Sequence, residues 1–86
     1  MIEDYRKAWQ NILKRQDIQK NMYDILIDQY QSLNKAYRDR KIDLNEFERR
    51  KRELDEHLEW LKKDIEDTKK ERETLENLPE NIKINQ

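Results

Sequence analysis

The sequence predicts an all-α fold: a long antiparallel hairpin of two helices, with coiled-coil-like packing, that dimerises into a four-helix bundle. Two series of positions step alternately by three and four residues, which places their side chains on one seam of a helix that packs along another helix. Glycine is absent from the 86 residues, and the single proline is Pro79. A turn pattern around Asp43 separates the two series.

The first helix is expected over about residues 2–38. Acidic side chains near its start and basic side chains near its end suit the helix dipole. Its seam is apolar and aromatic except for two glutamines in the middle. The seam positions are Ile2, Tyr5, Trp9, Ile12, Gln16, Gln19, Tyr23, Leu26, Tyr30, Leu33 and Tyr37.

The turn carries the most specific local pattern in the chain. Asp43 is a favourable N-cap, because its carboxylate can accept a hydrogen bond from a free backbone N–H of the next helix. Glu46 completes a capping-box pattern, and Ile42 with Phe47 forms the pattern of a hydrophobic staple. We therefore expect the second helix to begin at Leu44.

The second helix is expected over about residues 44–77, because the residue before a proline is disfavoured in helical geometry. Its seam positions are Leu44, Phe47, Lys51, Leu54, Leu58, Leu61, Ile65, Thr68, Arg72 and Leu75. The two helices and the turn at 39–43 are expected to form one domain over residues 1–78. Residues 79–86 are expected to form a flexible C-terminal tail.

Folding the chain at the turn brings the two seams together along their whole length. We expect Gln19 to lie beside Leu61, and Trp9 to lie beside Arg72 with a cation–π contact. Polar residues within such a seam reduce stability but fix the register of the helices.

The stretch from Leu33 to Leu54 resembles the SHOCT pattern, a short helical-hairpin module of many bacterial proteins. The matching residues are Glu46, Phe47, Glu48, Lys51 and Leu54, whereas Lys or Arg replaces the usual turn glycine. The resemblance covers about a quarter of the chain. It implies an assembly module and no chemistry.

The first helix is apolar beyond its seam, so one partner helix cannot cover it. Exposed apolar patches of this kind mark interaction sites. Self-association into a four-helix bundle would bury the patch, and so would binding of a different protein. The residues that we expect to contact a partner are Ile18, Met22, Ile25, Ile27 and Trp60.

The charge of the chain is unevenly distributed although its net value is −1. Residues 35–52 carry eight bases against four acids, and residues 53–80 carry eleven acids against five bases. The basic turn end supports an alternative function, a small helical-bundle regulator that binds nucleic acid through phosphate contacts. The residues available for such contacts are Arg38, Arg40, Lys41, Arg49, Arg50 and Arg52.

No pattern of catalytic or metal-binding residues stands out. Cysteine is absent, which excludes disulfides and thiolate metal sites. His57 is the only histidine, and a lone histidine among helical carboxylates is a weak ligand set that is more typical of a solvated helix surface. We therefore expect no catalytic residue, no metal and no cofactor, and a chain that is not an enzyme.

The sequence predicts a small interaction module: an adaptor, an inhibitor, or an antitoxin-like or phage-encoded antagonist of a partner protein. Its expected partners are a second copy of itself and another protein, and no membrane. Because no apolar segment follows Met1, we expect a cytoplasmic location. The amino-acid usage is typical of a bacterial or phage source.

Overall fold

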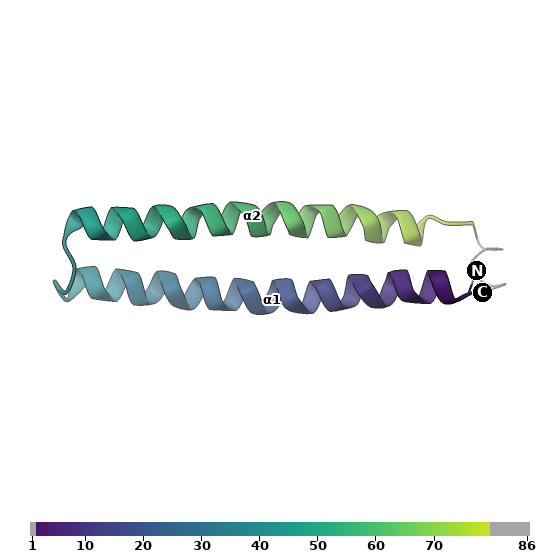
Figure 1. The fold of residues 1–86 in the computed structure, drawn as a ribbon, viewed down its shortest axis with the longest axis horizontal. Helices are drawn as coiled ribbons and strands as arrows, with labels where there is room; N and C mark the ends of the chain where they lie inside the picture. Colours follow the sequence, from purple (N-terminus) through teal and green to yellow (C-terminus); the bar gives the residue numbers. More distant parts are fainter. Residues whose placement is uncertain (1, 80–86) are drawn as a thin grey trace.

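The structure, a computed structural model, describes residues 2–79, with side chains from residue 4 onward. It contains two helices, α1 (Ile2–Arg38) and α2 (Leu44–Glu76), and no strand among the described residues. The helices run antiparallel and side by side, joined at one end by a short turn (Figure 1). The predicted all-α hairpin is therefore confirmed. The tail expected at 79–86 lies, apart from Pro79, outside the described residues.

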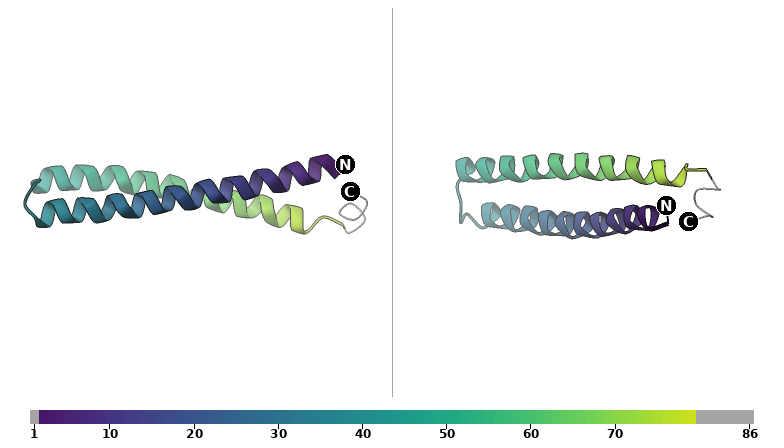
Figure 2. Two further views of the ribbon diagram at one scale, coloured as in Figure 1. Left: turned by 90° about the horizontal axis from the view of Figure 1, so that it is seen from below. Right: turned by 45° about the vertical axis from the view of Figure 1, so that its right-hand side comes forward.

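The hairpin is a thin rod with Cα extents of 62 × 15 × 13 Å. A view from below shows the helices crossing at a shallow angle (Figure 2). Near the turn, the rings of Tyr37 and Phe47 stack with centroids 4.6 Å apart. Near the free ends, the Arg72 guanidinium lies 5.5 Å from the Trp9 ring centroid, so the helices meet over almost their full length.

The core is a single row of side chains between the helices. Its apolar members are Ile12, Leu26 and Leu33 from α1 and Leu61 from α2, which is fully buried. The buried residues of α1, with Gln19 among them, recur at seven-residue intervals, as a seam between two helices requires. Rows on either side of this one are at least partly open to solvent.

The contacts between the seams show the register of the helices. The Trp9–Arg72 contact is confirmed. At the centre, Gln19 donates hydrogen bonds to Asp64 and Thr68, which lie three and seven residues beyond Leu61. These bonds between polar side chains favour one register over its neighbours.

The C-terminus of α1 is closed by a Schellman motif. The Lys41 N–H donates to the Ala36 carbonyl at 2.9 Å, and the Arg40 N–H donates to the Tyr37 carbonyl at 3.0 Å. This motif requires a left-handed residue at the position of Arg40, whose φ is 59°. A glycine usually stands here, because a Cβ destabilises the left-handed conformation.

The N-terminus of α2 is capped as predicted. The Asp43 carboxylate accepts a hydrogen bond from the Glu46 N–H at 2.8 Å. The reciprocal half of the capping box is not formed among the described residues. Instead the Glu46 carboxylate accepts hydrogen bonds from Arg49 at 2.6 Å and from Arg50 at 2.7 Å. These charge-assisted bonds hold the pKa of Glu46 below its ordinary value.

Replacement of Arg40 by glycine is expected to stabilise the hairpin by about 0.5–1 kcal/mol, because glycine adopts the left-handed conformation without steric penalty. The matched control is Arg38→Gly, which removes the same charge from the last helical residue of α1 and is expected to destabilise by a similar amount. Chemical denaturation followed by circular dichroism measures both. A loss of stability in Arg40→Gly would contradict the inference that the left-handed conformation of Arg40 destabilises the hairpin.

Candidate functional site

A buried polar network interrupts the apolar core at the middle of the hairpin. The Gln19 amide donates to the Asp64 carboxylate at 2.7 Å and to the Thr68 hydroxyl at 2.8 Å. The Thr68 hydroxyl in turn donates to the Asp64 carbonyl at 2.9 Å. Arg15 lies outside this layer and bridges Asp64, at 3.4 Å, and Glu71, at 2.7 Å. Both buried polar side chains are therefore hydrogen-bonded, and these bonds favour one register over its neighbours.

One broad side of the hairpin, which we call face A, brings together three of the predicted partner-binding residues. Met22 and Ile25 of α1 and Trp60 of α2 line an open groove that His57 and Gln29 also border. Ile25 and Trp60 are more than half exposed, at 56% and 57%. By helix geometry the face comprises residues 15, 18, 22, 25 and 29 of α1 and residues 53, 57, 60, 64, 67 and 71 of α2.

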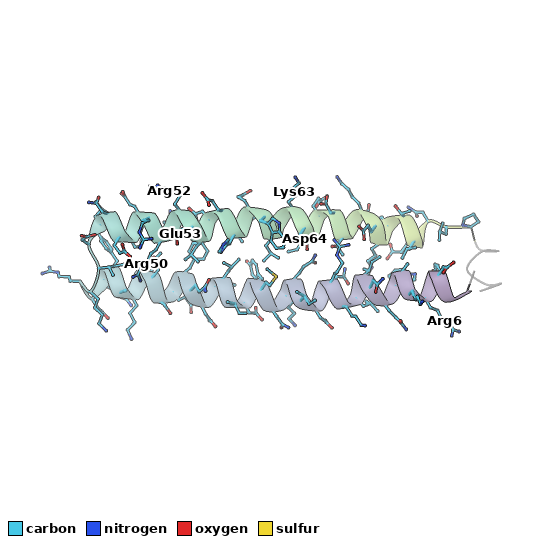
Figure 3. All side chains as sticks on the ribbon, in the orientation of Figure 1. Arg6, Arg50, Arg52, Glu53, Lys63 and Asp64 are labelled. Carbon is cyan, nitrogen blue, oxygen red and sulfur yellow. The ribbon has the colours of Figure 1, made fainter. Side chains whose placement is uncertain are left out.

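The groove on face A continues toward both ends of the hairpin. Toward the free ends it is lined by Ile18, which is 56% exposed, together with Arg15 and Glu71. Toward the turn it runs past Ile25 to Glu53 and Ser32. The labelled side chains of Glu53 and Asp64 lie between the two ribbons, whereas Arg6, Arg52 and Lys63 point away from the seam (Figure 3). Face A is thus a continuous shallow surface between two helices.

The structure places the remaining predicted partner residue, Ile27, on the opposite side. Ile25 and Ile27 are two residues apart, so their side chains point roughly 200° apart around α1. Ile27 is 38% exposed. It therefore does not adjoin the other four predicted residues.

The opposite side, which we call face B, is a second apolar surface that sequence reasoning missed. Tyr23 and Ile65 line a groove there with Lys20 and Lys69. The signal was present in the sequence, because Leu13, Lys20 and Ile27 recur at seven-residue intervals beside the seam. By helix geometry the face comprises residues 13, 16, 20, 23 and 27 of α1 and residues 58, 62, 65, 69 and 72 of α2. Its exposed apolar members are Leu13, Tyr23, Ile27 and Ile65.

Two of the six basic residues predicted at the turn end are engaged with acids of their own helix. Arg49 forms ion pairs with Glu46 and Glu53, and Arg50 forms an ion pair with Glu46. The other four are exposed, namely Arg38, Arg40, Lys41 and Arg52. The nearby rings of Tyr37 and Phe47 stack on each other, so one face of each ring is already occupied.

Metal-binding geometry is absent from the part of the chain that the structure describes. Within it, no three His, Cys, Asp or Glu side chains come together in an arrangement that could hold a metal ion. His57 is exposed beside the Trp60 groove. None of the described helices is both long and apolar enough to cross a membrane.

No protein-family model, curated protein or solved structure matches the chain. The resemblance of its turn region to the SHOCT pattern therefore gains no support from a family match.

Tyr30 forms a hydrogen bond between the two helices, on the face B side of the hairpin. Its hydroxyl donates to the Asp55 carboxylate at 2.6 Å. Burial, this hydrogen bond and the negative charges of Asp55 and Glu59 raise the pKa of Tyr30 to about 12 from an ordinary value of 10.0. The protonated form of Tyr30 is thus favoured by folding.

The pKa of Tyr30 predicts an alkaline decrease in stability. Below pH 10.0 the phenol is protonated in both the folded and the unfolded chain, so its contribution is fully present. Between pH 10.0 and about 12 only the unfolded chain loses the proton, and the free energy of unfolding falls. Tyr30→Phe is expected to lose about 0.5–1.5 kcal/mol at neutral pH and to flatten this part of the pH profile.

Denaturant unfolding across that window measures the effect, with Tyr23→Phe as the matched control. Tyr23 is 46% exposed and makes no hydrogen bond through its hydroxyl among the described residues. The control should keep the wild-type slope. Equal slopes for all three proteins would show that the Tyr30 bond does not contribute.

Proposed function

We propose that the hairpin is a non-enzymatic interaction module, of the adaptor or inhibitor class, that binds a helix of another protein on face A. The observation that carries this proposal is the exposure of Ile18, Ile25 and Trp60, each more than half accessible, along one groove. Helix-in-groove recognition uses such a surface, with apolar anchors at helical spacing entering between two helices. A third helix in the groove would bury the apolar side chains beside the seam, which two helices alone leave exposed.

Trp60 is the side chain best suited to anchor a partner. Tryptophan and tyrosine dominate binding energy at interfaces because they bury a large, rigid area. Trp60 lines the same groove as Met22, whose flexible thioether side chain adapts to differently shaped partners. The same surface supports self-association of the hairpin into a four-helix bundle.

Binding of nucleic acid at the turn end has less support. Arg49 and Arg50 already neutralise acids of α2, and the Tyr37–Phe47 stack leaves less ring surface for bases. If the turn end did bind nucleic acid, affinity would fall steeply with salt and with Arg38→Ala/Lys41→Ala.

Affinity capture with the full chain tests the proposal. Wild-type protein is expected to retain a partner that Ile25→Asp loses by roughly a hundredfold in affinity, because the substitution removes a buried apolar contact and leaves a charge in the interface. Leu44→Asp is the matched control, since Leu44 is exposed to a similar extent, 51%, but lies at the start of α2. If every captured protein binds Ile25→Asp as well as wild type, face A is not the docking surface.

A further inference from the structure

The two broad faces of the hairpin carry opposite charges around their exposed apolar side chains. On face A the acidic residues are Glu53, Asp64, Asp67 and Glu71, and the basic residues are Arg15 and, toward the turn, Arg50. On face B the basic residues are Lys20, Lys62, Lys69 and Arg72, and the acidic residues Asp55 and Glu76 lie nearer its two ends.

The ion pairs within the chain reduce this contrast but do not remove it. On face A, Arg15 pairs with Asp64 and Glu71, and Glu53 pairs with Arg49, while Asp67 has no ion pair among the described residues. On face B, Arg72 pairs with Glu76 at 3.0 Å, and Lys62 makes a long contact of 3.8 Å with Glu59. Lys20 and Lys69 border the Tyr23–Ile65 groove directly. Face A thus has a negative excess and face B a positive excess.

This pattern decides how two copies can meet. Face A against face A would bring carboxylates together, and face B against face B would bring ammonium groups together, and both arrangements are electrostatically unfavourable. Face A against face B pairs opposite charges. It also brings the apolar anchors of one face, Ile25 and Trp60, against those of the other, such as Ile65.

Simple translation of one hairpin along the normal to its faces produces the favourable contact. This movement lays α2 of one copy over α2 of the next, at the same height along the rod. Asp64 and Asp67 of one copy then lie at the level of Lys62 and Lys69 of the other, because each pair is close in sequence on one helix. The face measures about 62 × 15 Å, comparable with the roughly 800 Å² per partner that a stable interface buries.

We propose that face A of one hairpin binds face B of a second copy, in a heterologous contact that builds a four-helix bundle and leaves one face A and one face B free. This inference rests on the proposed function, in that face A is the docking surface, and it names the first occupant as the chain itself. A heterologous contact between opposite sides does not close on itself, so further copies can add to the stack. The end of each stack still presents a free face A to another protein.

Two variants that each block one face test the stacking. Ile25→Lys places a charge of the same sign as face B on face A, and Ile27→Glu places a charge of the same sign as face A on face B. Both positions are exposed, on opposite sides of α1, so circular dichroism should report the same helix content for both variants. Each variant alone is expected to associate roughly a hundredfold more weakly than wild type.

Sedimentation velocity of wild type, of each variant and of their equimolar mixture gives the decisive comparison. Wild type is expected to grow beyond a dimer with concentration and to dissociate as salt is raised. The mixture is expected to form a one-to-one heterodimer and to stop there, because the free face A of Ile27→Glu meets the free face B of Ile25→Lys.

Other outcomes overturn the proposal in distinguishable ways. A dimer of Ile27→Glu alone would show contact of face A with face A, and a dimer of Ile25→Lys alone would show contact of face B with face B. A wild-type chain that stays monomeric at all concentrations would exclude stacking. In that case the Ile25-dependent capture experiment still decides whether face A binds another protein.

Discussion

Two helices can bury only the row of side chains that each turns toward the other. In this hairpin that row contains Ile12, Leu26 and Leu33 opposite Leu61, and it leaves the flanking rows open on both sides. Small domains with so little buried surface are marginal alone. The exposure of Ile25 and Trp60 therefore follows from the architecture, and any gain in burial has to come from another chain.

The polar layer at the centre of the row links the register of the helices to the charge of face A. Gln19 and Thr68 could be replaced by apolar side chains without loss of packing, since a buried pair of polar groups adds little net stability. The pair favours one alignment of the two helices, because the hydrogen bonds of both side chains end on Asp64. Asp64 in turn meets Arg15, so the groups that align the helices also place charge on face A.

The sequence predicted the features that depend on local geometry. The spacing of the seam residues predicted the two helices. Asp43 predicted the start of α2, because an N-cap depends only on residues within one helical turn. The hydrogen bonds of Gln19 were not predictable from spacing, because spacing does not say which polar groups across the seam a side chain will bond. The side chain of Glu46 turned to Arg49 and Arg50, because nearby guanidinium groups offer stronger bonds than one backbone N–H.

The partner surface was predicted in part, because an apolar run around a helix does not say which residues share a side. The sequence predicts Ile25 and Ile27 on one partner surface because they are close together in the chain. Only the direction of the buried row, marked by Leu26 between them, separates them into faces A and B. Face B was missed for the same reason, since its lysines read as ordinary solvated charges until Tyr23 and Ile65 are seen beside them.

The segregation of charge by face matters more than the segregation by end that the sequence indicated. An apolar surface on each side of a rod would otherwise let copies meet in any combination, with poor control of assembly. Acids on face A and bases on face B penalise two of the three combinations and favour the third. A net charge of −1 is then the sum of two opposed surfaces, and the pairing of those surfaces, more than the total, determines what the hairpin can bind.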